Sequence, residues 1–212
     1  MPLGTSRTDR EDPHRRDTQH HTQGSDRGKL IVISAPSGAG KTTIAREILK
    51  RNPSLSFSVS ATTRTKRSGE VEGKDYYFLT KDEFLRRVRA AEFVEWEELF
   101  GNYYGTLKAE VNRALSRGKR LIFDVDVNGG LSIKRQYPDA LLIFILPPNI
   151  TVLKERLLKR QTENPQTMST RLERVPMEIE KGKEFDRQVI NDDLGRAVEE
   201  VDRIVKEHIQ KS

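Results

Sequence analysis

The chain has 212 residues, 34% of them hydrophobic and 33% charged, and its formal net charge is +6. This length suits one compact α/β domain with a small inserted subdomain. The absence of cysteine excludes disulfides, thiol catalysis and cysteine-ligated metals, and it fits a reducing, cytoplasmic location. Since no stretch approaches the roughly 18 apolar residues of a membrane helix, we expect a soluble protein with no membrane partner.

Residues 1–28 differ in composition from the rest of the chain. They hold only two large apolar residues, Met1 and Leu3, and five arginines balance five acids, so the net positive charge belongs to residues 29–212. Such a segment buries too little apolar surface to offset its ordering entropy, and we expect a disordered N-terminal tail. The charge of the remainder favours an anionic ligand, and composition alone leaves nucleotide and nucleic acid open.

Strand-like apolar runs alternate with helical segments from residue 30 onward, which is typical of a mostly parallel sheet with helices on its faces. The runs at 121–125 and 141–146 are continuously apolar, as in strands buried on both faces. The expected strands of the core are 30–34, 121–125, 141–146 and 188–191. We expect one helix over residues 41–51, a second that begins after a cap at Asn149, and a third that begins after a cap at Asp193.

Between residues 55 and 105 the pattern changes. Strand-like segments at 57–60 and 76–79 carry aromatic residues, and the capping box from Thr80 to Glu83 opens a helix that runs to about residue 90. Glycines punctuate the turns of this region. We therefore expect an inserted antiparallel subdomain over about residues 55–106, within a core formed by residues 29–54 and 107–212.

Residues 34–43 read Ser-Ala-Pro-Ser-Gly-Ala-Gly-Lys-Thr-Thr and join the first strand to the first helix. Backbone N–H groups of such a loop converge on phosphate oxygens, and the glycines let the backbone approach them closely. The pattern therefore predicts a nucleoside-triphosphate site. The predicted residues are Ala35, Pro36, Ser37, Gly38, Ala39, Gly40, Lys41, Thr42 and Thr43. Lys41 would reach the β- and γ-phosphates, the Thr42 hydroxyl would bind Mg²⁺, and Ala35 replaces the usual first glycine.

Two further polar segments are candidates for ligand binding. Arg64 and Arg67 lie three residues apart in a non-helical stretch, with Tyr76 close behind, and arginine forks with tyrosine hydroxyls suit a phosphate. A solvated basic loop is the alternative. Asp124 and Asp126 follow a buried strand, at the end where α/β sheets place their ligands, although a helix-capping role for either is also open. Only one histidine lies outside the tail, so we expect no catalytic histidine.

Taken together, the phosphate loop, the segment with Ser60, Arg64 and Arg67, the pair Glu95-Trp96 and the Asn-Tyr-Tyr-Gly turn at 102–105 resemble the guanylate kinase family over about residues 30–205. The resemblance implies a P-loop-type parallel sheet core, an inserted antiparallel GMP-binding subdomain and a helical lid at about residues 156–172. It also implies Mg²⁺-dependent phosphoryl transfer from ATP to GMP, and to dGMP. We expect a cytoplasmic monomer or homodimer whose partners are the small molecules ATP and GMP, with no nucleic acid.

The resemblance assigns two groups of residues to GMP. Those that would hold its phosphate are Arg64, Arg67, Tyr76 and Tyr104, and those that would recognise guanine are Ser60, Glu95, Thr106 and Asp126. Guanine presents N1–H and the N2 amino group side by side, and one carboxylate such as Glu95 can accept from both. Adenine presents an acceptor at N1 instead, which would leave a buried carboxylate facing a lone pair.

The resemblance also assigns residues to ATP, Mg²⁺ and catalysis. Asp124 would help Thr42 hold the hydrated Mg²⁺, and Arg160 and Asn191 match positions near the adenine of ATP. The implied catalytic residues are Lys41, Arg64, Arg156, Arg160 and Arg171. Arg156 and Arg160 share one helix face at i, i+4, where a solvated charged face is the alternative to a lid that stabilises the transferring phosphoryl group.

This chain departs from the family pattern at two further positions, and other functions stay open. Asn128 stands where glutamine is common, and Gln161 stands where a glycine often follows the lid arginine. A catalytically inactive guanylate-kinase-like scaffold is one alternative, against which the intact Lys41 and Thr42 argue. A P-loop GTPase is another, but the chain lacks an Asn-Lys-x-Asp guanine signature. A related kinase for another phosphorylated substrate is a third, which the Ser60 and Glu95 pair disfavours.

Overall fold

The structure, a computed structural model, describes residues 28–99, 101–158 and 165–211. Its core is a five-stranded sheet in the order β2-β7-β1-β8-β9, and every neighbouring pair of strands is parallel. The strands are β1 (Lys29–Ser34), β2 (Leu55–Phe57), β7 (Arg120–Asp124), β8 (Leu141–Leu146) and β9 (Arg187–Ile190). The predicted parallel core is confirmed, and residues 1–27 of the predicted tail lie outside the described residues.

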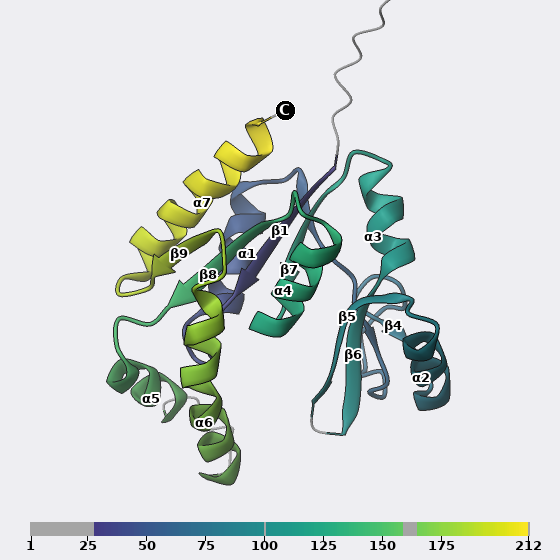
Figure 1. Cartoon of the computed structure of the whole chain (residues 1–212), viewed down its shortest axis with the longest axis horizontal. Helices are drawn as coiled ribbons and strands as arrows, with labels where there is room; N and C mark the ends of the chain where they lie inside the picture. Colours follow the sequence, from purple (N-terminus) through teal and green to yellow (C-terminus); the bar gives the residue numbers. More distant parts are fainter. Residues whose placement is uncertain (1–27, 100, 159–164, 212) are drawn as a thin grey trace, which may run out of the picture.

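Helices cover both faces of the core sheet (Figure 1). The pair on one face is α1 (Lys41–Arg51) and α7 (Leu194–Gln210), and the pair on the other is α3 (Lys108–Leu115) and α4 (Val127–Gln136). Alternate residues of β1 serve the two faces: Ile31 and Ile33 join the α1–α7 cluster, and Leu30 and Val32 join the α3–α4 cluster. This double burial explains why the central strands read as continuous apolar runs.

The other two helices of the core lie between β8 and β9 in the chain. They are α5 (Ile150–Leu158) and α6 (Pro165–Gly182), and the predicted lid covers the end of the first and the start of the second. Asn149 Oδ1 accepts from Val152 N at 2.9 Å before α5. Asp193 Oδ1 accepts from Arg196 N at 2.9 Å before α7, so both predicted caps are confirmed. None of the described helices is both long and apolar enough to cross a membrane.

A second sheet forms a separate lobe beside the core (Figure 1). Its strand order is β4-β3-β6-β5, and its strands are β3 (Ala61–Thr62), β4 (Tyr77–Phe78), β5 (Phe93–Leu99) and β6 (Asn102–Leu107). The predicted antiparallel character holds for β3 with β6 and β5 with β6, but β3 pairs with β4 in parallel. The connection over residues 63–76 is long enough for this return, since a parallel crossover needs about a dozen residues.

Strand β2 lies in the core sheet rather than in this lobe. It pairs in parallel with β7, so the second sheet begins at β3 and not at residue 55 as expected. The lobe has its own small core on one face of the sheet, where α2 (Lys81–Arg89) packs. Phe84 of α2 is fully buried and stacks on Phe93 and Tyr103, with ring centroids 4.3 and 5.4 Å apart. The other face is thereby left for the cleft toward the core sheet.

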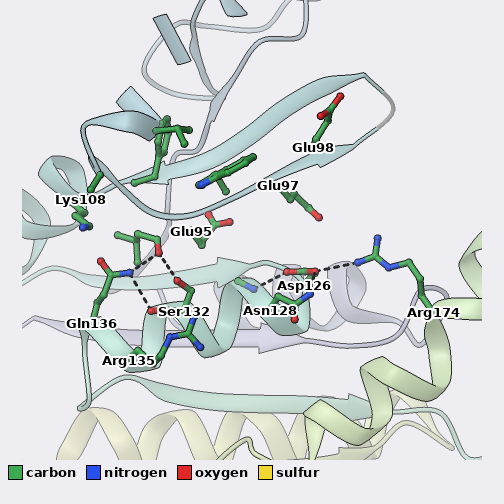
Figure 2. Close-up of a pocket in the computed structure, with 16 residues that line it drawn as sticks. Glu95, Glu97, Glu98, Lys108, Asp126, Asn128, Ser132, Arg135, Gln136 and Arg174 are labelled. Carbon is green, nitrogen blue, oxygen red and sulfur yellow. Dashed lines mark hydrogen bonds and ion pairs between the residues drawn. The ribbon is translucent and has the colours of Figure 1, made fainter. Parts of the chain in front are cut away.

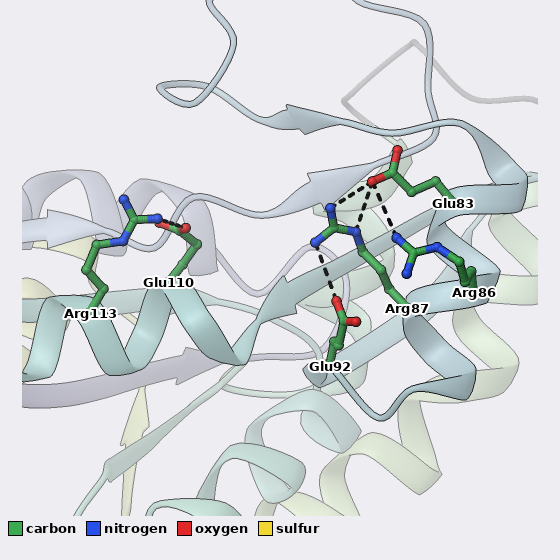
Figure 3. Close-up of polar contacts among 6 residues, drawn as sticks. All are labelled: Glu83, Arg86, Arg87, Glu92, Glu110 and Arg113. Carbon is green, nitrogen blue, oxygen red and sulfur yellow. Dashed lines mark hydrogen bonds and ion pairs between the residues drawn. The ribbon is translucent and has the colours of Figure 1, made fainter.

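Helix α4 joins the lobe to the core. The carbonyl oxygen of Val94 in β5 accepts from Ser132 Oγ at 2.7 Å and from Gln136 Nε2 at 2.6 Å (Figure 2). Other ion pairs lie on the surface around α2 and α3. Glu83 pairs with Arg86 and Arg87, Arg87 also pairs with Glu92, and Glu110 pairs with Arg113 (Figure 3). Such solvated pairs contribute little to stability, typically about 0–1 kcal/mol each.

Candidate active site

The phosphate loop connects β1 to α1 at the C-terminal edge of the core sheet. Gly38 and Gly40 have φ of 89° and 100°, the left-handed region that glycine adopts without strain. A Cβ at Gly40 would lie 2.4 Å from Asn191 Nδ2, so a larger residue does not fit there. Ala91 is the one described non-glycine residue with positive φ, so Ala35 replaces the usual glycine in an ordinary backbone conformation.

Lys41 and Thr42 both contact Asp124. Lys41 Nζ lies 2.7 Å from Asp124 Oδ1 and donates to the carbonyl oxygen of Val125 at 3.0 Å. Thr42 Oγ1 donates to Asp124 Oδ2 at 2.9 Å. The parallel pairing of β1 with β7, in which Ile33 is opposite Asp124, brings these segments together.

The two predicted metal residues therefore meet, and they offer a hydroxyl and a carboxylate. Hard oxygen donors of this kind suit Mg²⁺, which commonly keeps several waters and binds nucleotide phosphates through its remaining positions. In the described part of the chain, no group of three or more His, Cys, Asp or Glu side chains is arranged to hold a metal. Thr42 and Asp124 thus fit a nucleotide-borne, partly hydrated ion rather than a cage built by the protein.

Arginines from α5 and α6 reach the surroundings of the phosphate loop. Arg171 Nη1 donates to Ser37 Oγ at 3.1 Å, and Arg156 Nη2 donates to the carbonyl oxygen of Asn191 at 3.1 Å. Arg160, the other predicted lid arginine, lies outside the described residues. Asn191 is 3% exposed, and its Nδ2 donates to the carbonyl oxygen of Ala39 at 2.8 Å. This buried side chain therefore stabilises the conformation of the phosphate loop. The expected contact of Asn191 with adenine stays a prediction.

Three of the four residues predicted to recognise guanine, Glu95, Thr106 and Asp126, lie close together between the second sheet and the start of α4. Glu95 in β5 is directly opposite Thr106 in β6, and Thr106 is fully buried. Asp126 caps α4, because its Oδ1 accepts from Gly129 N at 2.8 Å. A Cβ on Gly129 would lie 3.4 Å from Glu95 Oε2 and 3.2 Å from Asp126 Oδ1, so the two carboxylates converge on the start of α4.

A cavity of about 620 Å³ lies between β5 and α4 (Figure 2). Its volume falls in the range of about 300–1,000 Å³ that is typical of small-molecule sites. Glu95, Glu97, Asp126 and Arg174 are among its lining residues. The predicted phosphate residues of GMP are not, so the cavity joins Glu95 and Asp126, two of the residues predicted to recognise guanine, but does not extend to the arginine pair.

Acidic groups crowd this cleft. Burial raises the pKa of Glu95 to about 7; the nearby Thr106 opposes the rise, and the charges of Glu97 and Asp126 reinforce it. Burial, followed by the charge of Asp126, also raises the pKa of Glu97. Glu178 in α6 is 8% exposed, and burial raises its pKa as well. Glu95, Glu97 and Glu178 therefore ionise at higher pH than free carboxylates do.

Sequence reasoning missed two residues of α6 that face this acidic cluster. Arg174 Nη2 lies 3.3 Å from Asp126 Oδ2, and Arg174 Nε lies 3.7 Å from Glu178 Oε1. Asn128, the position that departs from the family, donates from Nδ2 to Asp126 Oδ2 at 3.4 Å and accepts from Lys181 Nζ at 2.5 Å. The i, i+4 spacing of Arg174 and Glu178 was visible, but nothing in the sequence distinguishes that pair from a solvated one.

The predicted phosphate residues of GMP form a second group beside β3. The guanidinium of Arg64 lies over the ring of Tyr76 at 5.2 Å from its centroid, and the rings of Tyr76 and Tyr104 are 6.3 Å apart. Arg67 is exposed, and its backbone N–H donates to Glu70 Oε2 at 2.7 Å. Ser60 accepts from Tyr77 N at 2.9 Å through its carbonyl oxygen, and the expected contact of its hydroxyl with guanine stays a prediction.

The fold and these contacts define the class of the protein. A phosphate loop on the central strand of a parallel sheet, with an acid at the end of the neighbouring strand, is the site of a P-loop nucleotide-binding protein. The comparisons with known proteins specify the family. The model of the guanylate kinase family matches residues 27–208.

Individual relatives agree. The chain is 49% identical to the guanylate kinase of Chlorobium luteolum over 82% of its own length and 89% of that protein. It is 47% identical to the guanylate kinase of Thermotoga maritima, over 85% and 87%. A crystal structure of guanylate kinase from Anaplasma phagocytophilum superposes with a TM-score of 0.67 at 29% identity, covering 88% of this chain and 89% of that one. The chain belongs to the guanylate kinase family, as its motifs predicted.

Proposed function

We propose that this protein transfers the γ-phosphoryl group of ATP to GMP, and to dGMP, giving ADP and the corresponding diphosphate. The observation that carries the proposal is the convergence of Glu95 and Asp126 on one cavity, at the end of the strand whose Asp124 contacts Lys41 and Thr42. An acidic site for a base thus adjoins a cationic site for phosphates. A scaffold without catalysis would have no use for the second.

Phosphoryl transfer depends on in-line positioning and on charge stabilisation more than on acid–base groups. Lys41 would exchange its contacts with Asp124 and Val125 for phosphate oxygens. Arg171, which already reaches Ser37 of the loop, would stabilise negative charge on the phosphoryl group as it transfers. Arg156 and Arg160 would assist from the lid.

The acceptor nucleotide would be held at both ends. The Glu95 carboxylate would accept from N1–H and N2–H of guanine, with Asp126, Ser60 and Thr106 around the base. Arg64, Arg67, Tyr76 and Tyr104 would bind the monophosphate. When bound, Mg²⁺ supplies neutralisation of the donor phosphates, and Thr42 and Asp124 would hold it, the latter through water.

A coupled assay of ADP release over GMP, AMP, CMP and UMP tests the function. We expect GMP alone to turn over well. Lys41→Ala should abolish turnover, and Glu95→Gln should weaken GMP and relax base choice. A wild-type protein that binds GMP but releases no ADP would instead support the scaffold.

We also propose that the second sheet and the α5–α6 segment close over the core when both nucleotides bind, which would exclude water. The contact of Arg174 with Asp126 supports this, because it already links α6 to the GMP side of the cleft. Small-angle scattering with GMP and a non-hydrolysable ATP analogue should show compaction, and an unchanged radius of gyration would contradict it.

We further propose action in the cytoplasm, as a monomer or homodimer on small molecules rather than nucleic acid; the absence of cysteine supports the location.

A further inference from the structure

The carboxylate of Glu70 binds one edge of the Arg64 guanidinium. Arg64 Nη2 donates to Glu70 Oε1 at 2.7 Å, and Arg64 Nη1 donates to Glu70 Oε2 at 3.1 Å. The two side chains are only 14% and 19% exposed. Two parallel N–H···O bonds between charged groups give both strength and a defined orientation. The hydrogen bonds from Arg64, and next that from the Arg67 N–H, hold the pKa of Glu70 at about 2, so its carboxylate is ionised at any working pH.

The same carboxylate is anchored to the backbone. Glu70 Oε2 accepts from Arg67 N at 2.7 Å, and Glu70 N donates to the carbonyl oxygen of Arg67 at 3.2 Å. Glu70 therefore fixes the Arg64 side chain relative to the turn that carries Arg67. The two arginines predicted to bind one phosphate are connected through this acid.

Aromatic rings hold the plane of the same guanidinium. Its central carbon lies 5.2 Å from the ring centroid of Tyr76 and 5.9 Å from that of Phe78. The Tyr104 hydroxyl lies beside it and contributes, after Glu70, to raising the pKa of Arg64. The contacts with one carboxylate and two aromatic rings together restrict the orientation of the guanidinium.

A guanidinium carries five N–H donors, which form two edges that can each bind a two-oxygen anion. Glu70 occupies the Nη1–Nη2 edge, and the second hydrogen of Nη1 goes to the carbonyl oxygen of Thr65 at 2.8 Å. No hydrogen bond from Nε of Arg64 to a described residue is found, and the Tyr104 hydroxyl beside the guanidinium is itself predicted to bind the monophosphate. The Nε–Nη2 edge is thus the one presented to a ligand, and a phosphate monoester has the matching pair of oxygens.

We propose that Glu70 is a positioning residue for the acceptor nucleotide: it holds Arg64 by one edge so that the other edge meets the monophosphate. The inference rests on the proposed function, because it takes GMP as the ligand of Arg64. Glu70 could instead compete with the phosphate by occupying its place on Arg64, and the two roles predict opposite effects on the binding of GMP. A positioning residue strengthens binding of the phosphate, and a competitor weakens it.

The experiment compares GMP with guanosine, which lacks the phosphate, by calorimetry on the full chain. In Glu70→Gln we expect the Kd and KM for GMP to rise at least about tenfold, since Arg64 must then be ordered on binding. The Kd for guanosine and the KM for ATP should change less than about twofold. Glu70→Asp keeps the charge with a shorter arm, and it should give an intermediate loss. In an Arg64→Met background, Glu70→Gln should have no further effect.

The matched control is Glu83→Gln, which removes an equally short arginine pair of the same lobe, with Arg87 at 2.7 Å, away from the cleft. Unchanged or tighter GMP binding in Glu70→Gln overturns the inference, and so does an equal loss for guanosine, which would indicate a general structural role. If Glu70→Gln does not fold, Glu70→Asp decides on the same readouts. Failure of the proposed function is distinguishable, because the wild type would then show no GMP turnover at all.

Discussion

The guanidinium of Arg174 in α6 lies 3.3 Å from the carboxylate of Asp126, the residue that caps α4. Asp126 therefore contacts both helices: its Oδ1 accepts from Gly129 N of α4, and its Oδ2 accepts from Arg174 of α6. Helix α6 also carries Arg171, which reaches Ser37 of the phosphate loop. One helix thus contacts both the predicted triphosphate site and the predicted guanine site, and Arg174 is its contact with the latter.

Replacement of Arg174 by glutamine should have a small, salt-dependent effect. The side chains of the pair are 39% and 21% exposed, and exposed pairs are worth only about 0.2–1 kcal/mol. We expect the KM for GMP to change by about two- to fivefold at low salt, and less in 0.5 M NaCl because the charges are screened. Arg203→Gln, which removes an exposed pair of α7, is the control. A rise in the KM for GMP of more than about twentyfold, equal at low salt and in 0.5 M NaCl, would instead show that Arg174 contacts the substrate directly.

Recognition of guanine should weaken as the pH falls through neutrality. The ionised Glu95 accepts from two guanine donors, and its pKa of about 7 means that a large fraction is protonated already at pH 6. We expect the KM for GMP to rise toward tenfold per pH unit below 7. The phosphate of GMP also titrates near 6, so the wild-type profile must be divided by that of Glu95→Gln, which shares this titration. A ratio that is flat from pH 5.5 to 8.5 contradicts the assignment.

The same group predicts how stability depends on pH. The pKa of Glu95 is about 7 in the folded chain, against an ordinary value of 4.5 for a glutamate, so between these values the folded state binds the extra proton. Stability therefore falls as the pH rises through that window. Relative to Glu95→Gln, the wild type should lose about 1–3 kcal/mol of unfolding free energy between pH 4.5 and 8, less than the full shift allows because the carboxylate faces an open cavity. Urea unfolding of both proteins at several pH values measures this difference, and a constant difference would exclude the shift.

Local signals predicted the parts of the fold that depend on few neighbours in the chain. The first helix runs over Lys41–Arg51 as expected, because the phosphate loop starts it and Asn52-Pro53 ends it. Thr80 caps α2 by accepting from Glu83 N at 3.2 Å, as the capping box indicated. Such signals act within one helical turn, so the sequence displays them directly.

Long-range pairing could not be predicted in the same way. The strand-like residues of β2 carry no mark that they pair with β7 in the core rather than with β3, and the parallel pairing of β3 with β4 depends on the path of a long connection. The same holds in the site. Glu70 and Arg174 look like solvated charges in the sequence, and only the tertiary fold brings the first to Arg64 and the second to Asp126. The family motifs identified ligand-binding candidates, and the structure added the side chains that hold them.

The contact of Thr42 with Asp124 predicts a dependence on magnesium. Thr42 Oγ1 donates to Asp124 Oδ2 at 2.9 Å, and the other carboxylate oxygen lies 2.7 Å from Lys41 Nζ. Asp124→Asn keeps the shape but removes the charge that attracts a divalent cation and orients the lysine. We expect kcat to fall at least about tenfold, and the Mg²⁺ concentration for half-maximal activity to rise severalfold, since a hard cation prefers a carboxylate to an amide.

Asp139→Asn is the control for this substitution, because Asp139 is exposed and follows α4 on the opposite edge of the sheet from the phosphate loop. Removal of the metal with EDTA should abolish turnover in the wild type and in both variants, and excess Mg²⁺ should restore it. If Asp124→Asn lowered kcat with no change in the Mg²⁺ requirement, Asp124 would act by holding Lys41 alone. The two roles separate cleanly in this titration because only the metal role depends on the concentration of the cation.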